Sequence, residues 1–243
     1  MESTVDFAGI AVDNVSLDEA AEIVRHFISE GKPRLVVTPN PEMIVASQAD
    51  TDLKTIINGA DLRVADGISM VVVSRILGHP LKERVSGIDL MLKLLEQGAD
   101  YHYKVFLLGS APGVAADAAI KIKQSYPGIN VVGIRDGYFT EGDESALIGS
   151  IRQAAPDLIF VGLGAGRQEK WLNRHLHELG ATVGMTIGGS LDVLSGRKKR
   201  APRWTQALYI EWLYRLVTEP QRWQRQLALP KFLYLMFRRA YFG

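Results

Sequence analysis

The chain has 243 residues, 47% of them hydrophobic, which is enough for one large core or for one domain with an appendage. It contains no cysteine, which excludes disulfides, thiolate metal sites and a cysteine nucleophile. The net charge of +1 conceals an uneven distribution: residues 197–243 hold 11 Lys and Arg but only 2 Asp and Glu, and residues 1–196 carry a net charge of −8. We therefore predict a core over 1–196 and a basic appendage over 197–243. The basic appendage indicates a polyanionic partner, namely nucleic acid, anionic lipid or a diphosphate-bearing substrate.

The N-terminal segment has neither a basic start nor a long apolar run, so we expect a cytoplasmic protein without a signal or transit peptide. A short strand is predicted from Phe7 to Val12. A helix is predicted from Ser16, because apolar residues recur there at helical spacing and Ser16 with Glu19 matches a capping box.

Polar residues follow the next predicted strand, Leu35 to Val37, at the turn that contains Thr38 and Asn40. Pro41 then begins a helix. A turn after a parallel strand is a common location for a binding site, and the hydroxyl and amide could bind a sugar or a phosphate. Such a sequence is equally typical of a stiff turn with no binding role.

A DxD pattern, Asp50-Thr51-Asp52, matches the motif with which many glycosyltransferases bind a divalent metal and a nucleotide diphosphate. It lies between two helical patterns and does not follow an apolar strand. Helix capping is therefore the favoured interpretation, and we predict no metal site.

The central candidate is Asp66, which follows a short apolar run and precedes a helical pattern that opens at Gly67. This places it at the carboxyl end of a strand, where open α/β sheets bind substrates. Arg84 lies downstream in a polar loop before Ser86, a plausible N-cap of the next helix. The alternative interpretation of Asp66 is that it only caps the helix that follows it.

Strands and helices alternate through the second half of the chain, which predicts a doubly wound, Rossmann-like α/β fold. The predicted strands are Lys104–Leu108, Ile129–Ile134, Asp157–Gly162 and Thr182–Ile187, and the predicted helices are 114–125, 143–154 and a segment that ends at Glu178.

Glycine-rich turns follow two of these strands, at Gly109-Ser110 and at Gly162 to Gly166. Backbone N–H groups at such turns, and at the helix N-termini they lead to, suit phosphate. Gly162 and Gly164 do not start a dinucleotide fingerprint, because the third glycine position is occupied by Arg167. The segment Gly188-Gly189-Ser190 likewise lacks the spacing of a hydrolase nucleophile elbow.

The basic appendage contains three arginines, Arg215, Arg222 and Arg225, that would share one face of a continuous helix. Such a face could bind a diphosphate through bidentate guanidinium contacts, or it could be an ordinary solvated surface. Residues 227–243 mix large apolar side chains with Lys and Arg. This segment is too short and too charged to span a bilayer, but its composition suits the interface of an anionic membrane. Nucleic acid or an oligomer contact are the competing partners.

Taken together, seven motifs resemble the WecG/TagA/CpsF glycosyltransferases, which build bacterial surface polysaccharides and wall teichoic acid. The motifs are TPNPEMI at 38–44, RVADGISMV at 63–71, ERVSGIDL at 83–90, FLLGSAPGV at 106–114, GLGAGRQEKW at 162–171, GGSLDVLSGRKKRAP at 188–202 and EWLYRLVTEPQRWQRQ at 211–226. One departure is Gly166-Arg167, where the family is expected to show Pro-Lys. Arg167 keeps the positive charge, so the change concerns the stiffness of the loop.

The resemblance implies an inverting transfer of N-acetylmannosamine from its UDP donor to the C4 hydroxyl of N-acetylglucosamine on undecaprenyl diphosphate, a step in teichoic acid linkage-unit synthesis. It implies no cofactor and no metal, a GT-E type core, and a helical appendage that binds the inner face of the cytoplasmic membrane. Oligomerisation stays open, and nucleic acid is not expected as a partner.

The resemblance also assigns residues. Asp66 would be the base, with Thr38, Asn40 and Gln168 as polar residues of the active site. Tyr138 and Asp192 are weaker candidates for nucleoside contacts, and the remaining substrate-binding candidates are Arg84, Gly109, Ser110, Gly162, Gly164, Arg215, Arg222 and Arg225.

Alternatives from other classes are a nucleotide-sugar oxidoreductase or epimerase on the same architecture, and a non-catalytic module that binds membranes. A related glycosyltransferase that uses UDP-N-acetylmannosaminuronic acid or UDP-glucose is the nearest alternative. The sequence alone does not separate these donors.

Overall fold

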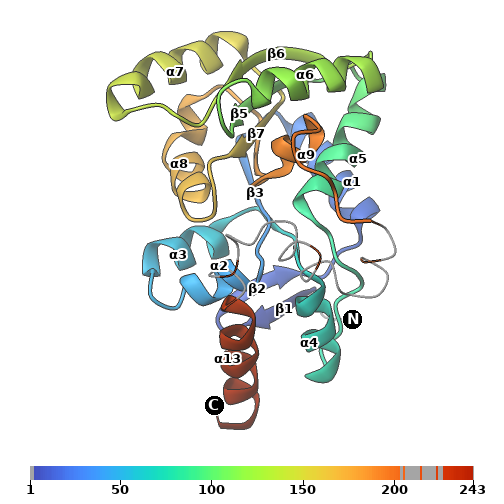
Figure 1. Cartoon of the computed structure of the whole chain (residues 1–243), viewed down its shortest axis with the longest axis vertical. Helices are drawn as coiled ribbons and strands as arrows, with labels where there is room; N and C mark the ends of the chain where they lie inside the picture. The colour runs from blue at the N-terminus through green and yellow to red at the C-terminus, as the bar shows by residue number, and fades with distance from the viewer. Residues whose placement is uncertain (1–2, 203–204, 206–213, 215–222, 224–226, 243) are drawn as a thin grey trace.

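The computed structural model describes residues 3–202, 205, 214, 223 and 227–242. Its centre is a six-stranded parallel sheet with the order β4-β3-β8-β7-β5-β6 and helices on both faces (Figure 1). The strands are β3 (Arg34–Val37), β4 (Leu62–Arg63), β5 (Lys104–Gly109), β6 (Asn130–Arg135), β7 (Leu158–Gly162) and β8 (Val183–Thr186). This confirms the predicted Rossmann-like, doubly wound fold.

Alternating side chains along each strand pack into two apolar clusters, one on each face of the sheet. In β3, for example, Leu35 and Val37 belong to one cluster and Val36 to the other. The Val36 face is covered by α1 (Leu17–Glu30), α5 (Gly87–Asp100), α6 (Val114–Ser125) and α9 (Ser190–Leu194). The Leu35 face is covered by α7 (Glu141–Ala154), α8 (Arg167–His175) and the short 3-10 helix η1 (Leu176–Glu178).

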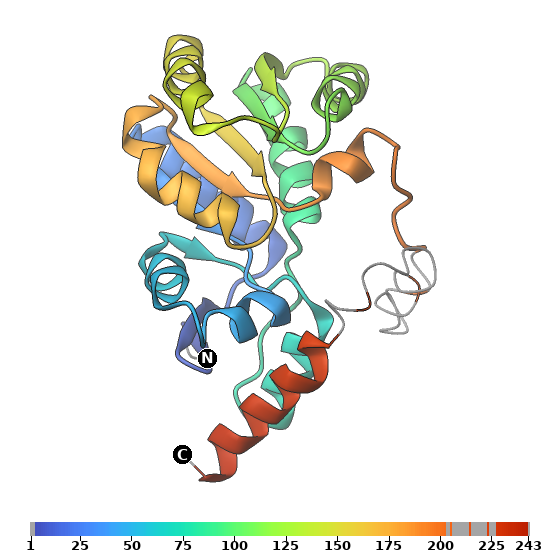
Figure 2. The ribbon, with the colours of Figure 1, turned by 60° about the vertical axis from the view of Figure 1, so that its left-hand side comes forward.

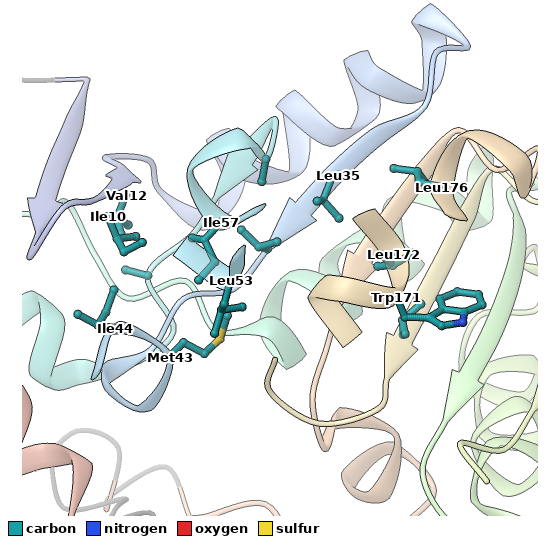
Figure 3. Packing of buried hydrophobic residues seen from close by; sticks show 14 of the residues in the cluster. Ile10, Val12, Leu35, Met43, Ile44, Leu53, Ile57, Trp171, Leu172 and Leu176 are labelled. Carbon is teal, nitrogen blue, oxygen red and sulfur yellow. The ribbon is translucent and has the colours of Figure 1, made fainter. Parts of the chain in front are cut away.

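The Leu35-side cluster continues beyond the sheet into a smaller unit of short helices and a hairpin (Figure 3). Figure 3 shows side chains of the hairpin, Ile10 and Val12, near Met43 and Ile44, with Leu53 and Ile57 between them and the sheet. The helices of this unit are α2 (Pro41–Ala46), α3 (Thr51–Gly59) and α4 (Ile68–Ile76). It therefore shares its core with the sheet domain.

The N-terminal segment differs from the single strand expected over Phe7–Val12. It forms an antiparallel hairpin of β1 (Thr4–Phe7) and β2 (Ile10–Asp13). The turn residues Ala8 and Gly9 have φ angles of 56° and 85°. Two consecutive positive φ angles are typical of the tight turn that reverses a hairpin, and an alanine at the first position hides that turn from a search for glycine pairs.

The last described helix, α13 (Ala228–Phe242), packs along α2 and α4 in the smaller unit (Figure 2). Phe232 is fully buried, and its ring stacks on Phe7 with a centroid separation of 6.1 Å. Met236 is also buried, and Arg239 forms an ion pair with Asp6 at 3.2 Å. The helical character predicted for the appendage is confirmed for this segment. Its division from the core at residue 196 stays a prediction.

Candidate active site

Most of the polar candidates lie at the edge of the sheet formed by the carboxyl ends of its parallel strands. Thr38 follows β3, Asp66 follows β4, and Gly188 follows β8. Gly109 and Gly162 are the last residues of β5 and β7. All five strands are parallel to their neighbours, so segments far apart in the sequence converge on one edge.

Asp66 connects three segments at this edge. Its backbone N–H donates to the carbonyl of Pro39 at 2.8 Å, and its Oδ2 accepts from the N–H of Gly87, the first residue of α5, at 3.4 Å. Helix α4 has Gly67 at its N-cap and no side-chain capping bond. Gly67, and not Asp66, therefore occupies the N-cap of α4, and the Asp66 carboxylate contacts the N-terminus of α5.

Thr38 lies beside the same glycine. A Cβ at Gly87 would lie 3.5 Å from the Oγ1 of Thr38, which is itself buried and donates to the carbonyl of Thr186 at 3.4 Å. The structure thus brings Thr38 and Asp66 together around the N-terminus of α5. Asn40 is the N-cap of α2, where its Oδ1 accepts from the N–H of Met43 at 3.0 Å.

Three glycines form the other half of the edge. A Cβ at Gly109 would lie 2.3 Å from the carbonyl oxygen of Gly162, and a Cβ at Gly162 would lie 2.5 Å from the carbonyl oxygen of Gly188. The ends of β5, β7 and β8 therefore approach one another through bare backbone. Gly109 also has a φ of 132°, which a residue with a side chain rarely adopts. The glycines predicted as a binding turn thus have a structural requirement of their own.

Ser110 continues this half into the surrounding loops. Its Oγ donates to the Oδ2 of Asp192 in α9 at 3.1 Å, and its φ is 60°. Its carbonyl accepts from the N–H of Gly137 at 2.9 Å, which brings the loop that carries Tyr138 next to it. The Tyr138 side chain is 74% exposed. Ser110, Asp192 and the loop that carries Tyr138 therefore lie around one turn, and their roles in substrate binding stay predictions.

Gln168 and its neighbour Glu169 lie at the start of α8, after the turn that contains Gly164. Both side chains are buried, and Glu169 has no exposed surface. Gln168 accepts through Oε1 from the N–H of Gly188 at 3.1 Å and donates through Nε2 to Glu169 at 2.7 Å. Burial raises the pKa of Glu169, although hydrogen bonds from Gln168 and Gly166 oppose the shift.

Glu169 was missed in the sequence. The sequence did contain a signal, because Glu169 lies at helical spacing from Leu172 and Leu176. All three side chains are buried in the structure. A carboxylate on the apolar side of a helical pattern should have been marked as a candidate.

Arg84 is held by Asp89, at 3.4 Å from its Oδ2. Asp89 also pairs with Arg200, at the start of the basic appendage, and accepts from the hydroxyl of Ser86. Burial by itself raises the pKa of Asp89, but Ser86, Arg200 and Arg84 outweigh it, so the pKa lies below its ordinary value. Ser86 is the N-cap of α5, as predicted.

The DxD pattern has the capping role that the sequence favours. Asp50 is the N-cap of α3 and accepts from the N–H of Leu53 at 3.0 Å. Its carboxylate also pairs with Lys170 of α8 at 2.6 Å. The Lys170 hydrogen bond is the main reason that the pKa of Asp50 is lowered.

The arginine face of the appendage, Arg215, Arg222 and Arg225, lies outside the described residues. Within 227–239, where the structure describes the side chains, the predicted apolar residues lie on two faces of α13. Phe232 and Met236 are buried against the smaller unit, whereas Leu233 and Tyr234 are 39% and 67% exposed. None of the helices within the described ranges is long and apolar enough to cross a membrane.

Residues 5–243 match the glycosyl transferase WecG/TagA/CpsF family, as the motifs indicated. The chain belongs to this family. The match of the family covers both the sheet edge and the appendage.

Curated relatives in this family share one name, N-acetylglucosaminyldiphosphoundecaprenol N-acetyl-beta-D-mannosaminyltransferase. The protein from Bacillus spizizenii is 34% identical over 222 residues, which cover 91% of this chain and 86% of the relative. The Bacillus subtilis protein is 35% identical over 208 residues, or 86% of this chain and 80% of the relative. The Staphylococcus aureus protein is 36% identical over 232 residues, or 95% of this chain and 91% of the relative. The WecG/TagA/CpsF assignment thus places this chain among glycosyltransferases.

Proposed function

We propose that this protein transfers N-acetylmannosamine from UDP-N-acetylmannosamine to the C4 hydroxyl of N-acetylglucosamine on undecaprenyl diphosphate, in teichoic acid linkage-unit synthesis. The name that the relatives share describes this sugar and this acceptor. The observation that carries the proposal is the position of Asp66, a carboxylate next to Thr38 and the N-terminus of α5 at the substrate-binding edge of the sheet.

In the proposed reaction, the Asp66 carboxylate accepts the proton of the acceptor hydroxyl. The hydroxyl oxygen attacks the anomeric carbon of the donor, and the bond from that carbon to the UDP oxygen breaks. UDP leaves on the opposite side, so the configuration inverts. One base beside the acceptor is sufficient for such a displacement, and no enzyme nucleophile is required.

The departing diphosphate requires positive charge or N–H donors. The glycine-rich turns after β5 and β7 support a role in binding it, because backbone N–H groups at such turns and at the helix N-termini that follow them suit phosphate. Arg84 supplies a guanidinium near α5, and we propose that Arg215, Arg222 and Arg225 complete the charge. We also propose that the reaction needs no metal.

Binding to the cytoplasmic membrane surface is the second part of the proposal. The acceptor is lipid-linked, and α13 has an outer face with exposed Leu233 and Tyr234 beside exposed Lys231 and Arg238. A mixed apolar and cationic helix face is typical of interfacial binding. Sedimentation with anionic vesicles across a salt series tests this, with Leu233→Ala/Tyr234→Ala expected to bind less. Equal binding to neutral vesicles would contradict the electrostatic part.

The reaction is tested by a donor comparison. The protein would be incubated with a short-chain lipid diphosphate of N-acetylglucosamine, EDTA and one of three donors: UDP-N-acetylmannosamine, UDP-N-acetylmannosaminuronic acid or UDP-glucose. We expect a disaccharide with a β linkage from the first donor. Product from another donor alone would correct the sugar, and loss of product in EDTA would contradict the metal-independent mechanism.

A further inference from the structure

Glu169 is a buried carboxylate for which the proposed reaction has no direct use. Its Oε2 accepts from the N–H of Gly166 at 2.7 Å, and its Oε1 accepts from the Nε2 of Gln168 at 2.7 Å. It also lies near the hydroxyl of Thr186, whose carbonyl accepts from Thr38. Glu169 and Gln168 together thus connect the turn after β7 with Gly188, which follows β8.

These contacts allow only one orientation of the Gln168 amide. The N–H of Gly188 can only donate, so the atom of Gln168 that faces it at 3.1 Å must be the oxygen. The amide nitrogen must then face Glu169, whose Oε1 accepts from it at 2.7 Å. If Glu169 were replaced by an amide, one of its two N–H contacts would become a donor facing a donor.

None of the described residues forms an ion pair with the carboxyl group of Glu169. The neighbouring cations are directed elsewhere: Lys170 pairs with Asp50, and the guanidinium of Arg167 lies 5.1 Å from the centroid of Phe139. Burying an unpaired carboxylate is unfavourable, and here N–H donors alone compensate for it. A neutral residue would avoid this energetic penalty but could not accept from both N–H groups.

We propose that Glu169 is a positioning residue, which fixes the Gln168 amide and the Gly164–Gly166 turn in the geometry needed for transfer. This inference rests on the proposed function, since Gln168 is one of its active-site candidates. The second amide proton of Gln168 is then a donor with a fixed direction beside Gly188, at the end of β8. Groups that orient an active-site residue in this way typically change rates by about 10-fold to 100-fold.

The first test compares Glu169→Gln with a matched control, Glu144→Gln. Glu144 also contacts α8, where it accepts from the Nε1 of Trp171 at 3.1 Å, and a glutamine retains an oxygen for that bond. We expect kcat to fall by about 10-fold to 100-fold in Glu169→Gln, with the donor KM within about threefold of the wild-type value. Glu144→Gln should stay within about twofold in both constants. A wild-type kcat in Glu169→Gln would overturn the proposal.

A double-mutant cycle separates positioning from general damage to the fold. If Glu169 acts through Gln168, adding Glu169→Gln to Gln168→Ala should cause no further loss of kcat. Losses that multiply would show that Glu169 acts independently and would overturn the proposal. An inactive wild-type protein would instead refute the proposed function.

A measurement on the wild-type protein covers the case in which Glu169→Gln does not fold. The side-chain amide signals of Gln168, assigned by their absence from the NMR spectrum of Gln168→Ala, should exchange slowly with solvent and be well resolved, because the amide is buried and held at both ends. Rapid exchange with averaged signals would overturn the proposal.

Discussion

The two halves of the sheet edge are built differently. At β3 and β4, side chains define the surface: Thr38 and Asp66 meet around the N-terminus of α5. At β5, β7 and β8, the backbone defines it, because Gly109 and Gly162 leave no room for a Cβ. The first half can supply a base, whereas the second can supply N–H donors to an anion. We propose that the acceptor hydroxyl binds at the first half and the nucleotide diphosphate at the second.

The largest effect is expected from removing the proposed base, Asp66. Asp66→Asn should retain the fold and lose about two to four orders of magnitude in turnover, because an amide cannot accept the proton. Steady-state transfer assays and thermal unfolding of the same preparation would measure both. Asp52→Asn is the control, since Asp52 is an exposed residue of the discounted DxD pattern, and it should keep wild-type turnover. Near-normal turnover in Asp66→Asn would show that Asp66 is not the base.

The second prediction concerns a substitution in the glycine half of the sheet edge. Gly109→Ala combines a positive φ with a Cβ that would lie 2.3 Å from a carbonyl oxygen, so we expect a loss of about 2 to 4 kcal/mol in the free energy of unfolding. Gly149→Ala, in the exposed part of α7 with open space around its Cβ, should instead stabilise by about 0.5 to 1 kcal/mol. Urea unfolding of the two variants measures this difference in stability. Equal effects of the two substitutions would contradict the close approach of Gly109 to the backbone of Gly162.

The third prediction concerns the connection between the side-chain half and the appendage. Asp89→Asn removes the charge that pairs with Arg84 and Arg200, and should lower the free energy of unfolding by about 1 to 3 kcal/mol at neutral pH. Denaturant unfolding measures this effect. Asp18→Asn, which breaks an exposed pair with Lys93, should change stability by less than about 0.5 kcal/mol. An equally small effect of Asp89→Asn would mean that the pairs contribute nothing.

The smallest expected effect is the pH dependence of the stability that Asp89 contributes. The pKa of Asp89 is lowered in the folded protein, so its contribution is present above the ordinary carboxyl pKa of about 4 and is lost as the pH falls through the folded pKa. The contribution of Glu169 to stability depends on pH in the opposite direction. Its pKa is raised in the folded protein, so the contribution is present at low pH and is lost as the pH rises through the raised pKa. The stability difference between wild type and Asp89→Asn should therefore shrink on acidification, whereas a constant difference would contradict the assignment.

The sequence predicted the arrangement of the sheet well because hydrophobic periodicity is a local signal. Helix 114–125 agrees with α6, and the capping box of Ser16 and Glu19 is present. Asp66 was placed correctly after a strand, although β4 has only two residues. Its contact with Gly87 could not be predicted, because it depends on how α5 returns to the sheet edge.

Interactions between distant segments explain the other differences. The burial of Glu169 depends on β8 lying beside β7, and the burial of Phe232 depends on α13 packing against the hairpin. Periodicity shows that a helix face is apolar, but it does not show whether that face binds a membrane or the protein's own core. One face of α13 packs against the core through Phe232, and we propose that the other face binds a membrane.

The most direct test of the division between the two halves is calorimetric titration of UDP into wild-type protein and Asp66→Asn. We predict dissociation constants within about twofold of each other, because the proposed base would contact the acceptor and not the nucleotide. A weakening of about tenfold or more in Asp66→Asn, in protein shown to be folded, would place Asp66 in the nucleotide site and contradict the account.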